Sequence, residues 1–321
     1  MVMRRDGPVE HRIFRDLPDI LKPGDLLVLN ETRVIAARLF GTRGAGGKAE
    51  VLLLRPSDRA RYDPSSTHWL ALVRPGRKLR EGASIAFGDL ATATVTAVHD
   101  DDGVRELAFD LTVPFETLLE RAGRLPLPPY IHNETQDAQD RYQTVFARTP
   151  GSVAAPTASL HFTPELFERL SARGVETARL VLDVGLGTFR PMQSERVDDH
   201  VMHAESYLLP DATVAAIERA REEGRRVVAV GTTVARALEG NIRKHGRLVP
   251  GSDETDIFIS PGFAFGAVDA MITNFHLPQS TLLVLVSALA GRTRILAAYG
   301  EAVAAGYRFF SFGDAMFVER A

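Results

Sequence analysis

Residues 270–281 read AMITNFHLPQST, so an amide, an aromatic ring and an imidazole follow directly after a short apolar run. Pro278 cannot continue a strand, which places Asn274 and His276 at its carboxyl end, beside a helix expected to start near Ser280. Imidazole exchanges protons near neutral pH, and a helix amino terminus lowers its pKa. We therefore predict that Asn274 and His276 face a reaction cleft and that His276 contributes to turnover. The alternative is a structural histidine bonded to a backbone carbonyl.

A second polar cluster follows the apolar run of VAVGTTVARALE. Gly231, Thr232 and Thr233 stand between an expected strand and an expected helix. A helix amino terminus at the carboxyl end of a strand can receive an anion or a polar ligand group. Simple helix capping by threonine is the alternative interpretation.

Two further segments carry candidate chemistry with weaker patterns. In VLDVGLGTFRP, Gly185 and Gly187 would let the backbone approach a ligand, although this motif alone favours a tight turn. In DDHVMHAE, His200, His203 and Glu205 could bind zinc, but the usual spacing of a second zinc-binding histidine is absent. We therefore expect no metal site.

The stretch RYQTVFARTPGSVAAPTASLHFT, residues 141–163, is long, polar and poor in charge. It contains Tyr142, Gln143, Thr157 and His161. Long irregular segments inside compact domains are more often functional than not, so this one is expected to line a cavity. A surface loop is the alternative.

The elements that must position these residues change character along the chain. Between residues 48 and 124, short strands follow one another with Gly, Pro and Asp turns, which is typical of a small antiparallel barrel. LPLPPYI, residues 125–131, is a stiff connector. Helix and strand patterns alternate afterwards. The fold class is therefore α/β: a layered α/β/α domain (1–47 plus 125–321) with an inserted antiparallel β-barrel domain (48–124).

Composition narrows the class of partner. The 321 residues include no cysteine, which excludes disulfides and thiolate metal sites and fits a reducing cytoplasm. The apolar runs are too short to span a bilayer, and the first residues do not form a signal peptide. With a net charge of −3, a nucleic acid would need a local basic patch. VRPGRKLREG, which contains Arg74, Arg77, Lys78 and Arg80, is the candidate; a solvated turn is the alternative.

Motifs spread over nearly the whole chain resemble one enzyme family, the S-adenosylmethionine:tRNA ribosyltransferase-isomerases of queuosine biosynthesis. The resemblance is carried, in family order, by LVLNETRVIAARLFG, LPLPPYI, RYQTVFA, GSVAAPTASLHFT, VGLGTFRP, HVMHAE, VGTTVARALE, TDIFISPG, TNFHLPQSTLLVLVSALAG and YRFFSFGDAM.

The resemblance implies a reaction and its partners. The ribosyl part of S-adenosylmethionine is transferred to 7-aminomethyl-7-deazaguanine at the wobble position of tRNA and isomerised to epoxyqueuosine, with release of adenine and methionine. S-adenosylmethionine is then a consumed substrate and no cofactor is expected. We expect a cytoplasmic monomer that binds tRNA and S-adenosylmethionine and no membrane.

The same motifs supply the candidate site residues. The expected catalytic residues are His276, Asn274, His161 and His203. The expected substrate-binding residues are Asn30, Thr32, Arg33, Arg38, Tyr142, Gln143, Thr157, Gly185, Gly187, Thr188, Phe189, Glu205, Gly231, Thr232, Thr233, Arg236 and Phe275.

Two features depart from the family pattern. The chain begins close to EHRIFRDL, where family members usually carry a longer opening segment, and Asp183 stands where they commonly have histidine. The short opening segment raises one alternative to the active enzyme, a shortened relative that binds S-adenosylmethionine or tRNA without turnover. A second alternative, independent of these departures, is a metalloenzyme that uses His200, His203 and Glu205.

Overall fold

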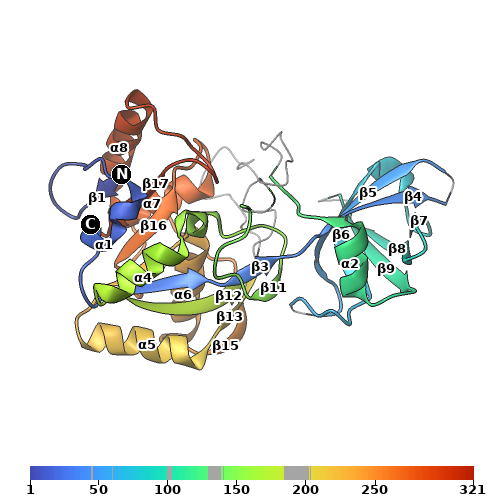
Figure 1. The fold of residues 1–321 in the computed structure, drawn as a ribbon, viewed down its shortest axis with the longest axis horizontal. Helices are drawn as coiled ribbons and strands as arrows, with labels where there is room; N and C mark the ends of the chain where they lie inside the picture. Colours follow the sequence, from blue (N-terminus) through green and yellow to red (C-terminus); the bar gives the residue numbers. More distant parts are fainter. Residues whose placement is uncertain are drawn as a thin grey trace.

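The computed structural model describes residues 1–44, 46–59, 61–99, 103–128, 139, 141–183, 202 and 204–321. They form two lobes joined by narrow connections, an α/β lobe that contains both chain termini and a smaller β-barrel (Figure 1). The expected fold class, a layered α/β domain with an inserted antiparallel barrel, is confirmed.

The α/β lobe is built on an eight-stranded sheet. In spatial order its strands are β1 (Val2–Met3), β17 (Ala315–Glu319), β16 (Ala270–Asn274), β14 (Val227–Val230), β2 (Leu26–Asn30), β12 (Glu176–Leu182), β13 (Glu205–Leu209) and β15 (Gly251–Thr255). The central strands β16, β14, β2 and β12 are parallel, whereas β17 and β13 run antiparallel to their neighbours. Every residue of β2, β14 and β16 is buried, which is the pattern of parallel strands covered on both faces.

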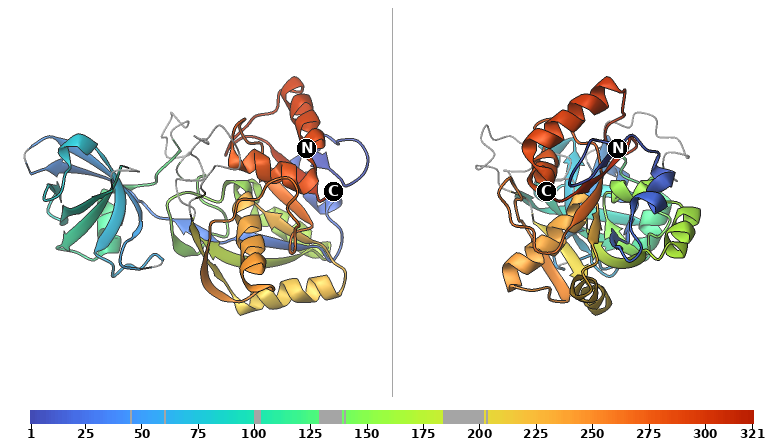
Figure 2. Two further views of the ribbon diagram at one scale, coloured as in Figure 1. Left: turned by 180° about the vertical axis from the view of Figure 1, so that it is seen from behind. Right: turned by 90° about the vertical axis from the view of Figure 1, so that its left-hand side faces the viewer.

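Helices cover the two faces of this sheet. One face packs against α5 (Asp211–Glu222), α6 (Thr232–His245), α7 (Thr281–Ala290) and α8 (Arg292–Ala304). The other packs against α1 (Leu17–Ile20), α4 (Pro164–Ala172) and the short η1 (Phe14–Asp16). The end-on view of Figure 2 shows the orange and red helices on one side and the blue and green helices on the other. The lobe therefore has three layers.

Local signals in the sequence explain where these helices begin. Thr163 precedes α4 and its hydroxyl accepts a hydrogen bond from the Leu166 amide at 3.2 Å, with Pro164 in the first turn. Ser280 does the same for α7, accepting from the Leu283 amide at 3.2 Å. The helix expected after Pro278 is thus present and capped.

The second lobe is a closed antiparallel barrel. Its strands, in spatial order, are β4 (Arg38–Arg43), β5 (Lys48–Pro56), β6 (His68–Arg74), β9 (Val104–Leu111), β8 (Ala91–His99) and β7 (Ser84–Phe87), and β7 pairs back with β4. Alternating burial along β5 and β6 points every second side chain inward, where Trp69 stacks on Phe115 with 5.0 Å between ring centroids. Phe115 begins α2 (Phe115–Ala122), which is followed by β10 (Gly123–Arg124). The short η2 (Gly76–Lys78) lies between β6 and β7. The barrel sheet starts at Arg38, upstream of the boundary expected at residue 48.

The lobes meet where the central strands end. β2 leads into β3 (Thr32–Val34), which pairs in parallel with β11 (Thr149–Ser152), and η3 (Thr157–His161) follows. From the barrel, Arg61 reaches Asp183 at the end of β12, with Nε 3.1 Å from Oδ2. Gly151 allows this approach: a Cβ there would lie 2.9 Å from both Asp183 Oδ1 and Tyr62 Cβ.

No single helix among the described residues is long and apolar enough to cross a membrane. The bent pair α7 and α8, at 116° to each other, reaches that length and composition only in combination.

Candidate active site

Polar residues gather at the carboxyl ends of the central parallel strands. Asn30 ends β2, Asp183 follows β12, Gly231 follows β14 and Asn274 ends β16. In open α/β sheets, ligands bind at this edge. The edge lies toward the junction with the barrel, since β2 runs directly into β3 (Figure 1).

A hydrogen-bonded network connects η3 to the end of β16. Nε2 of His161 lies 2.8 Å from Oδ1 of Asn274, and Nδ2 of Asn274 donates to Oγ1 of Thr157 at 3.0 Å. Asn274 is buried, with 4% of its surface exposed. Three of the predicted site residues, His161, Asn274 and Thr157, are therefore brought together from distant parts of the chain.

This network determines the state of the His161 ring. Because Asn274 uses its amide nitrogen on Thr157, its carbonyl oxygen accepts, and the His161 Nε2 carries the proton. Burial lowers the pKa of His161, and the hydrogen bond to Asn274 offsets this only in part. The ring is thus neutral at pH 7. Its Nδ1 holds a lone pair and has no hydrogen-bond partner among the described residues.

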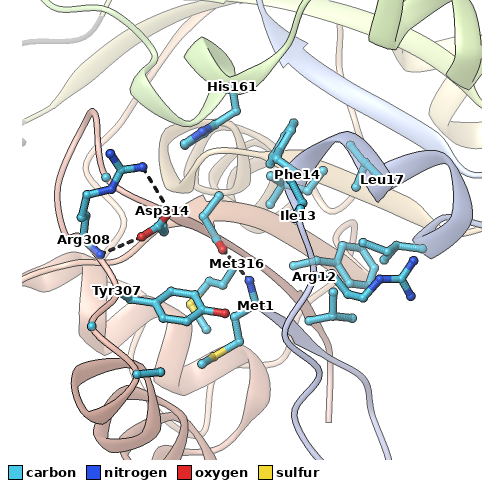
Figure 3. A pocket seen from close by; sticks show the side chains of 18 residues that line it. Met1, Arg12, Ile13, Phe14, Leu17, His161, Tyr307, Arg308, Asp314 and Met316 are labelled. Carbon is cyan, nitrogen blue, oxygen red and sulfur yellow. Dashed lines mark hydrogen bonds and ion pairs between the residues drawn. The ribbon is translucent and has the colours of Figure 1, made fainter.

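A cavity of about 480 Å³ opens beside His161. Phe14 stacks on the imidazole with 5.0 Å between centroids, and Ile272 of β16 contributes to the apolar wall. Figure 3 shows Tyr307, Arg308 and Asp314 around the same space. A smaller cavity of about 220 Å³ also contacts Phe14 and His161, so the stacked pair separates two hollows.

The polar rim of the larger cavity is held by its own contacts. Asp314 accepts a hydrogen bond from the Arg308 amide at 2.7 Å, and the Arg308 guanidinium lies 3.5 Å from its other oxygen (Figure 3). His11 lies 2.8 Å from the Tyr307 hydroxyl and 2.7 Å from Glu301. None of these rim residues was predicted from the sequence. The motif YRFFSFGDAM, which supports the family resemblance, contains three of them, Tyr307, Arg308 and Asp314.

His276 lies apart from the His161 network. Its Nε2 is 2.9 Å from the Thr273 hydroxyl, and its backbone amide donates to the Tyr299 hydroxyl of α8 at 3.0 Å. Successive residues of β16 point to opposite faces, so Thr273 and Asn274 direct these two histidines to different sides of the sheet. Burial, not the helix terminus, lowers the pKa of His276 to about 4. These contacts favour a structural role for His276, although its ring contacts the Thr273 hydroxyl and not the backbone carbonyl that the alternative interpretation named.

Two predicted substrate-binding residues use their side-chain amides to hydrogen-bond backbone groups. Asn30 accepts from the Leu182 and Thr32 amides at 3.0 and 3.1 Å and donates to the Leu182 carbonyl at 3.0 Å. Gln143 pairs with both backbone groups of Val34, at 3.1 and 2.8 Å. Both side chains satisfy backbone groups where strands diverge, which is a structural task.

Other predicted residues are also engaged within the protein. Glu205 and Arg236 form a buried ion pair, and Arg236 also donates to the Ile257 carbonyl. Phe275 is fully buried in an aromatic cluster with Tyr299.

The other residues predicted to contact substrate differ in burial and in their partners. Tyr142 is buried near Phe312, with 6.2 Å between centroids. Arg38 pairs with Glu50 on the barrel at 2.7 Å. Arg33 is exposed, whereas Thr32 is buried with an unpaired hydroxyl.

Several predicted residues lie outside the part of the chain that the structure describes: Gly185, Gly187, Thr188, Phe189, His200 and His203. The zinc alternative rested on two of them and stays a prediction. Glu205, its third member, is paired with Arg236.

Asp183, which departs from the family pattern, has a partner that sequence inspection missed. Arg61 contacts both of its carboxylate oxygens, at 3.1 and 3.4 Å. Burial nevertheless raises the pKa of Asp183, with Arg61 acting in the opposite direction. No local pattern could reveal this pair because the two residues are separated by 122 positions.

The basic turn of the barrel carries four exposed side chains, Arg74, Arg77, Lys78 and Arg80. None of these side chains forms an ion pair within the described part of the chain. The backbone of the turn is held in place, because Arg105 donates to the Leu79 carbonyl at 2.9 Å and to the Gly76 carbonyl at 3.3 Å. The turn therefore presents to solvent positive charges without ion-pair partners among the described residues, as a phosphate-binding surface would.

Comparisons with known proteins agree with this architecture. A family model described as queuosine biosynthesis protein matches residues 1–318. A curated S-adenosylmethionine:tRNA ribosyltransferase-isomerase from Symbiobacterium thermophilum is 55% identical, over 99% of this chain and 91% of that protein. One from Gloeobacter violaceus is 53% identical, over 96% and 85%. The crystal structure of S-adenosylmethionine tRNA ribosyltransferase from Thermotoga maritima is 38% identical, with a TM-score of 0.53 over 99% of this chain and 91% of that chain.

Proposed function

The chain belongs to the family of queuosine biosynthesis proteins and is an S-adenosylmethionine:tRNA ribosyltransferase-isomerase, and we propose that its reaction takes place at the network of His161, Asn274 and Thr157. One observation supports this position above all. Burial lowers the pKa of His161, its Nδ1 has no hydrogen-bond partner among the described residues, and its ring lines the cavity beside the end of β16.

The reaction requires a proton acceptor, a leaving adenine and an uncharged amine. The sulfonium of S-adenosylmethionine acidifies its 5′ carbon, so a positioned base can remove a proton there, and a hydrogen bond to the purine helps adenine to leave. The proposed acceptor is 7-aminomethyl-7-deazaguanine in tRNA, which gives epoxyqueuosine, adenine and methionine. S-adenosylmethionine is consumed in this scheme and no cofactor takes part.

In this scheme we assign His161 the role of proton acceptor. With its proton held on Nε2 by Asn274, the ring accepts at Nδ1 without first losing a proton. Phe14 and the apolar wall offer a surface for the adenosyl part and exclude water from reactive intermediates. Asn274 and Thr157 are positioning residues because they set the tautomer and the orientation of the ring.

The barrel is proposed to hold tRNA. Its exposed basic turn carries Arg74, Arg77, Lys78 and Arg80, whose phosphate contacts would be independent of sequence. We propose that the protein acts as a monomer in the cytoplasm, where its tRNA substrate is found.

The alternative of a binding protein without turnover is less well supported. Several curated enzymes match over 85–92% of their own length, and this extent favours the same activity. Asp183 is accommodated by Arg61, so the departure from histidine leaves an ordered strand end.

The decisive experiment is incubation with S-adenosylmethionine and tRNA that bears 7-aminomethyl-7-deazaguanine. We expect epoxyqueuosine in the nucleoside digest and free adenine in equal amount, both measured by mass spectrometry. A methylated base accompanied by S-adenosylhomocysteine would contradict the function. Bound S-adenosylmethionine without any product would support the binding-protein alternative.

A further inference from the structure

The connections of two neighbouring strands, β2 and β14, leave the sheet on opposite faces. The chain after β2 passes through the barrel and then α4 before it forms β12, and the chain after β14 passes through α6 and the edge strand β15 before it forms β16. α4 packs on one face of the sheet and α6 on the other. Such a divergence opens a crevice at the carboxyl ends of the two strands, and ligands of open α/β sheets bind there.

α6 begins at this crevice without a side-chain cap. Its amino-terminal neighbour is Gly231, at φ +97°, which has no side chain to offer. The amides of Thr232, Thr233 and Val234 have no acceptor in the described part of the chain, and the first bond is made by Ala235, to the Gly231 carbonyl at 3.3 Å. Aligned free amides and the helix dipole together favour an anion at this position.

The side chain of a buried residue, Thr233, points to the same place. Thr233 is only 8% exposed, and its hydroxyl has no hydrogen-bond partner among the described residues. A Cβ built on Gly231 would lie 3.7 Å from Thr233 Oγ1 and 3.8 Å from Ala158 Cβ. The unpaired hydroxyl therefore faces the position that a capping group would occupy. On the neighbouring η3, Ser159 has a fully buried hydroxyl that lacks a partner among the described residues. Buried polar groups without partners are destabilising unless something else satisfies them.

The chemistry of this position selects a small, singly charged acceptor. Amides and hydroxyls can donate to both oxygens of a carboxylate, and Gly231 adds no side chain that would compete for these donors. The guanidinium of Arg236 is committed to Glu205, so it does not balance the second charge of a phosphate.

We propose that the amino terminus of α6, with Gly231 and Thr233, binds the α-carboxylate of the methionyl part of S-adenosylmethionine. This inference rests on the proposed function, which supplies the ligand. It is consistent with the reaction centre, because the Gly231 amide donates to the Ile272 carbonyl at 2.8 Å, two residues before Asn274. Neighbouring strands are about 4.8 Å apart, so one molecule can contact both places.

The test compares two ligands and matched variants. Dissociation constants for S-adenosylmethionine and for decarboxylated S-adenosylmethionine are measured by calorimetry on wild type, Thr233→Val, Thr233→Ser and Thr281→Val. Thr281 is the first residue of α7 and controls for loss of a threonine hydroxyl at an unrelated helix terminus. Thr233→Val should raise the dissociation constant of S-adenosylmethionine about tenfold, as expected for the loss of one charge-assisted hydrogen bond. The dissociation constant of the decarboxylated ligand should not change. Thr233→Ser should restore binding.

Each other outcome has a definite meaning. If wild type binds both ligands equally, or if Thr233→Val weakens both alike, the carboxylate site is wrong while adenine release can still establish the proposed function. If wild type neither binds nor consumes S-adenosylmethionine, both proposals are overturned.

Discussion

The carboxyl edge of the α/β sheet and the basic turn of the barrel place polar groups in opposite environments. At the sheet edge, Asn274 is 4% exposed and fixes His161 through hydrogen bonds to groups far away in the chain. On the barrel, Arg74, Arg77 and Lys78 are exposed and make no ion pair with described residues. The sheet edge buries a few neutral groups and fixes their orientation, whereas the barrel turn exposes charges that have no ion-pair partner among the described residues.

If the proposed function holds, this difference separates the two tasks of the enzyme between its two lobes. Proton transfer depends on preorganised groups in a site that excludes water, where hydrogen bonds are strong. Holding a polyanion depends on long-range attraction and on release of counterions, which require exposure. A change at the sheet edge should therefore alter turnover, and a change on the barrel should alter tRNA affinity.

The largest expected effect is on turnover. His161→Ala should lower single-turnover adenine release roughly 10²- to 10⁴-fold, the usual contribution of a general acid or base, with tRNA affinity unchanged. His99→Ala, which removes an exposed barrel imidazole, is the matched control and should behave as wild type. A loss of less than tenfold for His161→Ala, in a variant that melts like wild type, would remove the reaction centre from this position.

The second expected effect is on stability in acid. Burial lowers the pKa of His276 to about 4, below the ordinary value of about 6.5, so between these values the unfolded state binds more protons. Above pH 6.5 the ring is neutral in both states, and its burial does not lower the free energy of unfolding. As the pH falls toward 4, the free energy of unfolding decreases by up to about 3 kcal/mol. Burial of His161 acts with the same sign.

The two lobes can be monitored separately in this experiment. Trp69, the single tryptophan, reports the barrel by fluorescence, and far-UV circular dichroism reports the helices, most of which belong to the α/β lobe. Urea unfolding at several pH values should show the acid effect in the dichroism, and His276→Asn should reduce its slope. If the slope is unchanged in His276→Asn and turnover falls instead, His276 is catalytic, as its position in the sequence first indicated.

The smallest expected effect is on tRNA affinity. Replacing Arg74, Arg77, Lys78 and Arg80 with Ala should weaken tRNA binding roughly tenfold at low salt. It should also reduce the slope of log affinity against log salt concentration by up to about 3, because fewer phosphate contacts form and fewer counterions are released on binding. Turnover at saturating tRNA should not change. The control removes four exposed charges from the α/β lobe: Lys22, Arg221, Arg247 and Arg292. Equal losses in both variants would mean that the barrel turn has no special role.

The sequence alone was sufficient for the local structure. Continuous apolar runs indicated the buried strands, and Thr163 with Pro164 and Ser280 marked the starts of α4 and α7. Short alternating strands indicated the barrel, although the barrel sheet begins at Arg38, before the domain boundary expected at residue 48. These features depend on neighbouring residues and on periods of 2 and 3.6, which a sequence displays directly.

Tertiary structure alone decided which polar groups meet. His161 and Asn274 are 113 positions apart, and they bond only because η3 packs over the end of β16. Asn30 and Gln143 look like ligand contacts in sequence but satisfy backbone groups, and His276 turns toward α8 because β16 ends with Thr273 and Asn274 on opposite faces. The order of strands and the direction of side chains arise from packing of the whole core, so adjacency in a site cannot be obtained from adjacency in the chain.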